Sequence, residues 1–411
     1  MNILFLSTYY SYPPDTGHYI RTYNTVKYLA KKNNLFFLSF AKERDNTNNY
    51  TSLKDICKSV DMFFVPADFS KLLMAMALFK SLFSANPFSA IKYCRNDFKY
   101  KLEEILQNNK IDIVHFDSLY LACYLRCVGG VTTALTVHNV ESQRMLSLLN
   151  STNNVFKRMF IFSQYKRILN YEKKVCHQFD ICVTVSDNDM QNLRRINSDG
   201  RFDVIPNGVD LNCFSPGKVK PEPNSMIWIG SMEGLWNRGA IDYFCNEIFP
   251  KIDQKINNVK FTVVGKSPTS ILKNISVKNK NVMILGYVDD ISNYVNRSSV
   301  FVVPLKAGGG TKLKVLNALA MGKAVVTTSV GAEGIEVTDN ENIVIADDPE
   351  TFAGKTVELL RNPEMVEELG RNAATLIRIK YDWEIIAKKH RQIYKEIVEG
   401  FALREFNKQS S

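Results

Sequence analysis

The chain has 411 residues, of which 45% are hydrophobic and 23% are charged, and its formal net charge is +10. This length favours two domains over one, and the composition excludes disordered and fibrous proteins. The positive charge leans toward the N-terminal half, but no basic run or aromatic RNA-binding signature accompanies it, so nucleic acid is not expected as a partner.

The first residues, MNILFLSTYYSYPPD, contain an apolar run that prolines soon interrupt, unlike a signal peptide. No run of about 20 apolar residues follows anywhere in the chain. The eight cysteines stand singly, without a CxxC pair or zinc-type spacing, as expected of small buried thiols in a reducing compartment. These features predict a cytoplasmic protein without a membrane span.

Short apolar runs alternate with helix-period segments along most of the chain, which predicts parallel sheets wrapped by helices. The candidate strands of the first half are NILFLS, LFFLSF, DMFFVP, IDIVHF, ALTVHN, ICVTVS and DVIPNG. Those of the second half are MIWIGS, KFTVVG, NVMILG, VFVVPL, AVVTT and NIVIA. Prolines and glycines break both periodicities at about residues 208–224. We therefore expect an α/β protein with two doubly wound domains, whose ligands bind beyond the carboxyl ends of the strands.

The predicted organisation has three parts. Residues 1–210 form the first Rossmann-like domain, and residues 211–379 form the second. Residues 380–411 form a C-terminal helix, expected to pack back toward the first domain, because an apolar stripe at helical spacing runs from Trp383 to Phe401.

Two stretches of the first half mix aromatic and aliphatic residues with lysines and arginines. They are KLLMAMALFKSLFSANPFSAIKYCRNDFKYKL from Lys71 and VFKRMFIFSQYKRILNYEKKV from Val155. Such a mixture suits an anionic membrane surface, and it equally suits helices that pack their apolar faces on the sheet. Both interpretations remain open at this point, and the first implies a protein peripheral to the inner face of the membrane.

The segment PLKAGGGTKLKVLNALAMG, from Pro304, carries the chemistry of an anion site. A strand leads into glycines and then a helix, for which Thr311 is the expected N-cap and Gly322 the residue after the C-cap. Glycines let a phosphate approach the free N–H groups of a helix start, and Lys312 and Lys314 add positive charge. The segment lacks the GK[ST] ending of a P-loop and does not fit GxGxxG. A flexible loop before an ordinary amphipathic helix is the structural alternative.

Asn317 favours the ligand interpretation. It lies seven residues after Gly310, almost on the same face of the helix, and its amide can donate to and accept from a sugar hydroxyl. With these residues the segment resembles the signature of glycosyltransferase family 4, retaining enzymes of the two-domain GT-B fold in which two Rossmann-like domains face each other across a cleft. VIPNGVDLNCFSP resembles the interdomain segment of the same family.

The resemblance implies which residues bind a nucleotide diphosphate sugar. The donor-binding candidates are Gly17, Gly230, Ser231, Arg238, Tyr287, Val288, Gly309, Gly310, Thr311, Lys312, Leu313, Lys314 and Asn317. The acidic pair of the family falls on Gly309 and Asn317, so neither carboxylate is present. Ser231 replaces the family's arginine and Arg238 stands near the place of its lysine, so Lys312 and Lys314 are expected to restore the missing charge.

In the first half, the resemblance extends to the branch of exopolysaccharide-associated sugar transferases. It implies that Gly17 approaches the donor phosphates and that His138, after the strand ALTV, is the catalytic-site histidine that contacts a sugar hydroxyl. Arg21 is a candidate on the acceptor side, with a solvated surface charge as the alternative. His115, which also ends a strand, is expected either to be a packing residue or to support a neighbouring site residue.

The implied function is a retaining, hexosyltransferase-type glycosyltransferase that moves a sugar from a nucleotide diphosphate sugar to a glycan or lipid-linked acceptor. No cofactor and no metal are expected, and the pair Asp289 and Asp290 is interpreted as a helix cap. Two alternatives stay open: a non-catalytic GT-B partner or regulatory subunit, favoured by the missing carboxylates, and a nucleotide-sugar epimerase.

Overall fold

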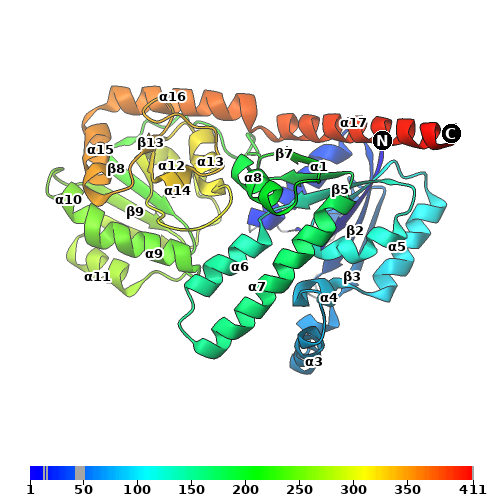
Figure 1. Ribbon diagram of the computed structural model, residues 1–411. Coiled ribbons are helices and arrows are strands. Elements are labelled where there is room, and N and C mark those ends of the chain that lie inside the picture. The colour runs from blue at the N-terminus through cyan, green and yellow to red at the C-terminus, as the bar shows by residue number, and fades with distance from the viewer. Residues whose placement is uncertain (13, 15–16, 42–50, 410–411) are drawn as a thin grey trace. The chain divides into compact units, whose positions relative to one another are not determined.

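A computed structural model describes residues 1–12, 14, 17–41 and 51–409 of the chain (Figure 1). The chain divides into two compact units, Met1–Ile205 with Ile386–Ser411, and Pro206–Ile385. Each unit has its own parallel sheet, so the predicted α/β class with two doubly wound sheets is confirmed. The boundaries predicted from the sequence were residues 210 and 379.

The first unit is built on a seven-stranded sheet of order β3-β2-β1-β4-β5-β6-β7. Its strands are β1 (Asn2–Ser7), β2 (Asn34–Ala41), β3 (Ser59–Phe64), β4 (Ile113–Phe116), β5 (Thr132–Val137), β6 (Ile181–Thr184) and β7 (Phe202–Val204). Because helices cover both faces of such a sheet, its central strands are almost continuously apolar and buried. The chain leaves β1 toward β2 on one side and returns to β4 on the other, so the strand order reverses beside β1.

Helices surround this sheet. They are α1 (Gly17–Ala30), α2 (Thr51–Lys54), α3 (Lys71–Leu82), α4 (Phe88–Tyr93), α5 (Asn96–Asn108), α6 (Glu141–Asn150), α7 (Val155–Val175), α8 (Asp187–Ile196) and α17 (Trp383–Gln409), with 3₁₀ segments η2 (Pro66–Asp68), η3 (Leu119–Cys127) and η4 (Cys176–Gln178). From Ile386 onward α17 belongs to the first unit. The Tyr394 hydroxyl of this helix lies 2.5 Å from Nδ1 of His115 on β4.

The second unit is built on a six-stranded sheet of order β10-β9-β8-β11-β12-β13. Its strands are β8 (Glu222–Ile229), β9 (Lys260–Val264), β10 (Val282–Gly286), β11 (Ser298–Val303), β12 (Ala324–Thr327) and β13 (Val344–Ile345). Alternate residues of β8 enter two different cores: Met226 and Trp228 pack into one cluster, and Ile227 packs into the other. Strand order reverses again, here between β8 and β11.

The helices of the second unit lie on both faces of its sheet. They are α9 (Leu235–Tyr243), α10 (Phe249–Asp253), α11 (Ser270–Lys278), α12 (Ser292–Arg297), α13 (Leu313–Ala320), α14 (Ser329–Ala332), α15 (Pro349–Arg361) and α16 (Pro363–Lys380), with a π-helical turn η5 (Phe244–Ile248). Phe244 and Phe352 join the core of Met226, whereas Ala318 and Ala373 join the core of Ile227. The sheet is therefore buried on both sides.

Two local predictions need correction, and a third is confirmed. The predicted strand DVIPNG ends at Val204, since Pro206 has no N–H for a ladder. Thr311 does not cap α13, because the helix begins at Leu313 after Lys312, and no side chain caps it. Gly322 does follow the C-cap as predicted, with φ of 66°.

Two further predictions concerned the burial of the cysteines and the presence of membrane-spanning helices. Cys176, Cys182 and Cys245 are buried, but Cys94 and Cys213 are exposed, so the expectation of uniformly buried thiols is wrong. Across the described part of the chain, each helix is too short or too polar to cross a bilayer.

Candidate functional site

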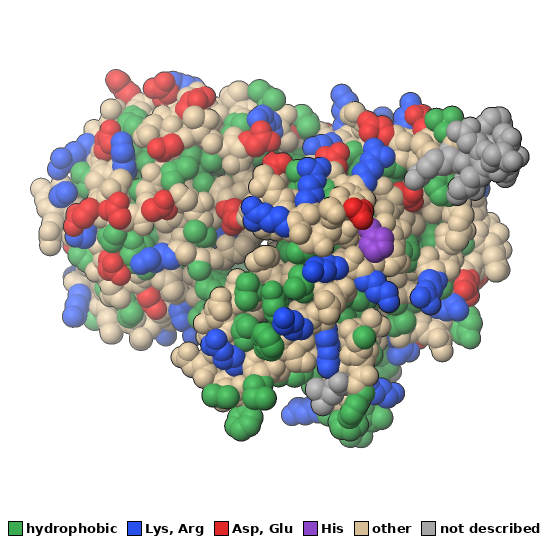
Figure 2. Space-filling view, viewed as in Figure 1, with side chains coloured by type: hydrophobic (Ala, Val, Ile, Leu, Met, Phe, Trp, Pro, Cys, Tyr) green, Lys and Arg blue, Asp and Glu red, His purple; other side chains and the backbone are tan. Residues whose placement is uncertain are grey.

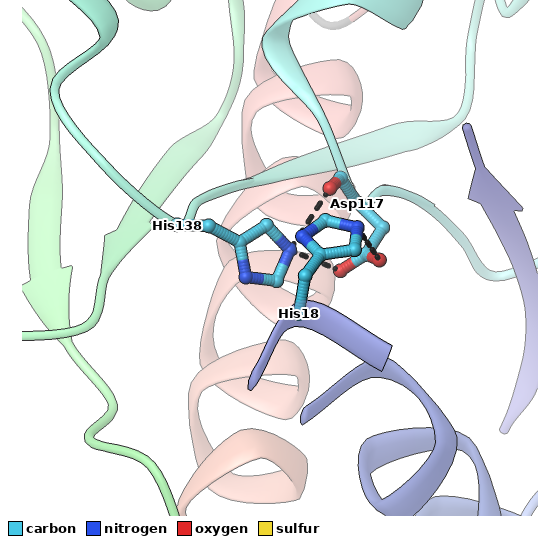
Figure 3. Close-up of side chains that lie close together, drawn as sticks. All are labelled: His18, Asp117 and His138. Atoms are coloured by element: carbon cyan, nitrogen blue, oxygen red, sulfur yellow. Dashed lines mark hydrogen bonds and ion pairs between the residues drawn. The ribbon is translucent and has the colours of Figure 1, made fainter. Parts of the chain in front are cut away.

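A cluster of polar side chains lies at the carboxyl edge of the first sheet, beside β1, where the strand order reverses. Asp117 directly follows β4, His138 directly follows β5, and His18 is the second residue of α1. Figure 3 shows the two imidazoles next to each other beside the Asp117 carboxylate, with ring centroids 4.1 Å apart. Nε2 of His138 lies 2.9 Å from Oδ1 of Asp117, and Nε2 of His18 lies 3.9 Å from Oδ2. Reversal points of parallel sheets are where such folds bind their ligands.

Asp117 is held as a buried anion. Its side chain is 3% exposed, and Oδ2 accepts hydrogen bonds from the hydroxyls of Thr22 at 2.5 Å and Ser7 at 3.4 Å. Burial alone would raise the pKa of this carboxyl, but His138, His115 and His18 hold it well below its ordinary value. The carboxylate therefore stays charged throughout the physiological pH range.

The bonds to Asp117 fix the tautomer of His138. Its Nε2 also lies 3.0 Å from the Asp117 carbonyl oxygen, and since a carboxylate and a carbonyl can only accept, Nε2 must carry a hydrogen. Nδ1 is then the atom of the ring that can accept from a ligand. His138 lines a pocket of about 350 Å³ together with Tyr9, His18, Tyr120 and Arg144.

The three side chains of this cluster also have the composition of a metal site. One nitrogen or oxygen from each of His18, Asp117 and His138 lies within 4.8 Å of the others. A hydrogen bond that needs no ion joins Asp117 and His138, and His18 lies 3.9 Å from the same carboxylate. The expectation that no metal is needed stays a prediction.

Buried side chains, including His115 and His390, surround the cluster on the inner side of the first unit. His115, which is 0% exposed, stacks on Phe5 and lies 3.1 Å from the Thr136 hydroxyl through Nε2. Burial lowers the pKa of His115, and it lowers that of His390 on α17 well below the ordinary value. Both rings are accordingly neutral, as suits the packing role predicted for His115.

Arg21 and Gly17 lie on α1. The Arg21 guanidinium is 2% exposed and donates to the carbonyl oxygen of Ile205 at 2.8 Å, and burial lowers its pKa to about 10. It is therefore no solvated surface charge, and its acceptor-side role stays a prediction. Gly17 is exposed at the first position of the helix.

In the second unit, the loops that follow β8, β9, β10 and β11 meet at the carboxyl edge of the sheet. The loops after β8 and β9 approach so closely that a Cβ at Gly265 would lie 1.8 Å from the Gly230 carbonyl oxygen. A Cβ at Gly230 would lie 2.8 Å from Nζ of Lys314. Glycine at position 230 thus leaves the space that the lysine occupies.

Lys314 lies in the first turn of α13, and its side chain extends toward Gly230 in the loop after β8. Its ammonium lies 4.8 Å from the Trp228 ring centroid and donates to Oδ1 of Asn237 at 2.8 Å. Burial, together with the neighbouring charge of Lys312, lowers the pKa of Lys314 to about 7. An anion that binds beside this lysine would stabilise its protonated, charged form.

Lys312 orders the glycine loop, which consists of Gly308, Gly309 and Gly310. Its Nζ donates to the carbonyl oxygens of Gly308 at 3.0 Å and Gly310 at 2.6 Å and forms an ion pair with Glu333 at 3.5 Å. Gly308 and Gly310 have φ of 129° and 70°, which side-chain-bearing residues rarely adopt. Thr311 lies beside this loop, with its hydroxyl 3.5 Å from the Gly334 carbonyl.

The other donor-site candidates occupy the same edge. Arg238 donates through Nε to the Met232 carbonyl at 3.1 Å, and Ser231 accepts at its carbonyl from Asn237 at 2.9 Å. Tyr287 is 65% exposed, with Lys266 4.6 Å from its ring centroid. Val288 and Leu313 pack on the core, Asn317 is half-buried on α13, and a Cβ at Gly309 would meet no atom within 4 Å.

Sequence reasoning missed several residues of these clusters, among them His18, Asp117, Asn237 and Glu333. Asp117 carried a signal, since it follows the strand IVHF in the same way as His138 follows ALTV. Asn237 and Glu333 carried none, because their contacts with Lys314 and Lys312 join residues far apart in the chain. The second unit brings together Gly230, Ser231, Arg238 and the segment from Gly309 to Lys314, whereas Gly17, Arg21 and His138 lie in the first unit.

Sequence comparison finds two matching families. Residues 223–362 match the glycosyl transferases of group 1, and residues 81–212 match glycosyltransferase family 4. The two matched segments fall on opposite sides of the chain's division at Ile205 and Pro206, apart from a few residues.

Individual relatives are distant. The chain is 24% identical over 306 residues to an uncharacterized 44.6 kDa protein in the cps region of Klebsiella pneumoniae, covering 72% of this chain and 76% of that one. It is 26% identical over 270 residues to the UDP-Gal:alpha-D-GlcNAc-diphosphoundecaprenol alpha-1,3-galactosyltransferase of Escherichia coli, covering 60% of this chain and 67% of that one.

Solved structures share the fold. The sucrose-phosphate synthase of Thermosynechococcus elongatus superposes with a TM-score of 0.68 at 16% identity, covering 97% of this chain and all of that one. HepE of Anabaena, solved in complex with UDP, has a TM-score of 0.66 at 13% identity, with 96% and 100% covered. The fold of the chain is therefore GT-B.

Proposed function

Because the chain belongs to the group 1 and family 4 glycosyltransferases, retaining enzymes that use a nucleotide-sugar donor, we propose that it transfers a hexose-type sugar from a nucleoside diphosphate sugar to a glycan or lipid-linked acceptor. The observation that carries this proposal is Lys314, whose buried amine lies directly under Gly230 at the reversal point of the second sheet. The product would enter polysaccharide or glycoconjugate synthesis.

The donor diphosphate would bind where the loops after β8 and β11 meet. Gly308, Gly309 and Gly310 leave backbone N–H groups accessible there, and Lys314 supplies a positive charge in a low-dielectric setting. HepE of Anabaena has been solved with UDP and with UDP-glucose, which supports a nucleoside diphosphate as the ligand class.

The nucleotide would extend from the diphosphate along the same edge. Asn317 offers a neutral hydrogen bond to the ribose where the family places a glutamate, and Tyr287 and Val288 would line the base. Arg238 and Ser231, on the loop after β8, would lie beside the phosphates. Without the two carboxylates, nucleotide binding depends more on charge at the phosphates.

The acceptor would bind in the pocket beside His138 in the first unit. The Escherichia coli relative is named for an acceptor sugar carried on diphosphoundecaprenol, and the Klebsiella pneumoniae relative for the cps region. These names support a lipid-linked acceptor and a place at the inner face of the membrane. Tyr120 and Arg144 bring polar groups to the pocket that suit sugar hydroxyls.

The proposed mechanism is mainly electrostatic. As the bond between sugar and diphosphate breaks, Lys314 and the glycine-loop N–H groups stabilise the charge that develops on the leaving oxygen. That oxygen can take the proton of the acceptor hydroxyl on the same face of the sugar, which gives retention. His138, oriented by Asp117, would hold a sugar hydroxyl through Nδ1.

A donor screen tests the proposal. The purified chain is titrated with UDP-, GDP-, ADP- and dTDP-sugars in a calorimeter, and mixtures with acceptors are then analysed by mass spectrometry. The proposal expects one donor class to bind and its sugar to appear on an acceptor. Binding without hydrolysis or transfer to any acceptor would favour a regulatory subunit, and conversion of the donor into another sugar would favour an epimerase.

A further inference from the structure

Two helices of the first unit carry large apolar side chains that are exposed to solvent. On α3 and the residue after it, Leu72, Leu73, Met76, Phe79 and Phe83 are 71%, 41%, 47%, 63% and 80% exposed. On the first half of α7, Val155, Phe156, Met159, Phe160 and Phe162 are 65%, 84%, 66%, 40% and 49% exposed. We call these ten residues the apolar surface.

The apolar surface is continuous with the protein core through the rest of α7. Ile168, Tyr171 and Val175, in the second half of that helix, are buried. Core packing therefore explains why α7 is apolar in its second half, and it does not explain Phe156 or Met159. Soluble monomers rarely keep such a patch exposed without an interaction that uses it.

The two parts of the apolar surface are fixed to each other. The Arg167 guanidinium of α7 donates to the Ser81 carbonyl of α3, and Oε1 of Gln164 accepts from the Phe88 amide of α4 at 3.1 Å. Figure 1 shows α3 and the junction of α6 and α7 projecting on the same side of the first unit, and Figure 2 shows apolar side chains gathered there with lysines and arginines between them. They can therefore engage one partner together.

The two chain segments that carry the apolar surface contain cations and no acidic residue. No aspartate or glutamate occurs between Asp68 and Asp97, or between Glu141 and Glu172. Exposed cations in these segments are Lys71, Lys80, Arg144, Lys157, Arg158 and Lys166. A protein partner is usually met by mixed charges, whereas helices that intersperse exposed apolar side chains with lysines and arginines match the interface of an anionic bilayer.

We propose that the apolar surface inserts into the interface of a bilayer containing anionic phospholipids, with the surrounding lysines and arginines on lipid phosphates. Phe79 and Phe156, at 63% and 84% exposure, would enter the acyl boundary, and Lys157 and Arg158 would stay at the headgroups. This bilayer would be the membrane partner of the proposed function. The inference rests on that function only in that a lipid-linked acceptor would lie in the same bilayer.

The test is a flotation assay of the full chain with phosphatidylcholine vesicles and with vesicles that also contain about 30% phosphatidylglycerol. The wild-type chain should float with the anionic vesicles at low salt, and a tenfold rise in salt should weaken binding at least tenfold. Phe79→Ser with Phe156→Ser, and Lys157→Glu with Arg158→Glu, should each reduce partitioning at least tenfold. The matched control is Val277→Ser with Lys278→Glu on α11, also an exposed apolar and basic pair, which should bind as the wild type does.

Donor titration of the same proteins separates this inference from the proposed function. Loss of vesicle binding with unchanged donor affinity in the two α3 and α7 variants supports the membrane surface, because these residues lie outside the donor site. The inference is overturned if the wild-type chain ignores anionic vesicles at low salt while it still binds donor. It is also overturned if the serine variants abolish a dimer without changing vesicle binding, since the occupant would then be a second copy of the chain.

Discussion

Nε2 of His138 lies 2.9 Å from Oδ1 of Asp117 and 3.0 Å from the carbonyl oxygen of the same residue. The two residues end neighbouring parallel strands, β4 and β5, so the sheet itself sets their separation. A histidine bound twice to one acceptor residue is fixed in both tautomer and orientation, which leaves Nδ1 for the ligand.

Replacing Asp117 with asparagine should lower kcat/KM about 10- to 100-fold, because His138 loses a charge-assisted hydrogen bond and its fixed tautomer. Steady-state kinetics on the chain measures this. Asp180→Asn is the matched control, since Asp180 also holds a neighbouring strand, through Thr133, but at the start of β6. Equal losses in both variants would mean that Asp117 acts only through stability.

The stability of the chain should depend on the charge of Asp117. Its folded pKa lies well below the unfolded value of about 3.9, so the carboxylate contributes stability above that unfolded value and loses the contribution as pH falls through the folded pKa. Asp117→Asn should cost about 1–3 kcal/mol at pH 7 and flatten the decline in acid. Urea denaturation between neutral and acid pH would show this, and parallel curves for wild type and variant would contradict it.

Donor binding should take up a proton at Lys314. With a pKa of about 7 the amine is mostly neutral at pH 8, and a diphosphate beside it would raise that pKa. Calorimetry at pH 8 in two buffers of different ionisation enthalpy should find uptake of up to about one proton in the wild type and none for Lys314→Met.

Lys323→Met is the control for that measurement. Burial lowers the pKa of Lys323 to about 8, but this lysine precedes β12, at the opposite edge of the sheet, and donates to the Asn296 carbonyl. Its variant should keep the proton uptake. If Lys314→Met also kept the uptake with the same donor affinity, Lys314 would not be the diphosphate group.

Asn317→Glu should strengthen nucleotide binding about tenfold, because a carboxylate makes charge-assisted bonds to ribose hydroxyls where an amide makes neutral ones. Asn317→Gln keeps the length of glutamate without the charge and should show no gain. Adding Gly309→Glu is sterically feasible, since a Cβ there meets no atom within 4 Å. Weaker binding by Asn317→Glu in the calorimeter would place the ribose elsewhere.

Removal of divalent ions should leave transfer unchanged. Since Thr22 and His138 hold the Asp117 carboxylate through hydrogen bonds that need no ion, EDTA should not lower the rate, whereas added Zn²⁺ should inhibit by competing for the side chains of His18, Asp117 and His138. A loss of rate with EDTA that Zn²⁺ or Mg²⁺ restores would instead make the cluster a metal centre.

The sequence predicted the two sheets well because buried parallel strands are continuous apolar runs, as in Ile3 to Leu6 and Val300 to Val303. It predicted the position of the glycine loop because three consecutive glycines separate an apolar strand from a segment with helical periodicity. The start of α13 was misplaced by one residue, since Lys312, and not the cap-forming Thr311, precedes the helix.

The supporting contacts of the site could not be read from the sequence. Tyr394 reaches His115 across 279 positions, and Lys314 reaches Asn237 across 77. Such pairs depend on the packing of α17 and α13 on their sheets, which periodicity does not specify. The exposure of Phe79 and Phe156 was equally open, because an apolar helix face looks the same in sequence whether a sheet or a lipid covers it.

Single-turnover transfer tests the central claim most directly, namely that this chain is a working retaining glycosyltransferase without the carboxylate pair. The donor identified by titration is mixed with excess enzyme and a lipid-linked acceptor, and the product is followed by quenched flow and its anomeric configuration read by NMR. The account predicts transfer with retained configuration by the wild type and at least a tenfold slower rate for Lys314→Met at saturating donor. Tight donor binding with no transfer by the wild type, or an equal rate for the variant, would contradict it.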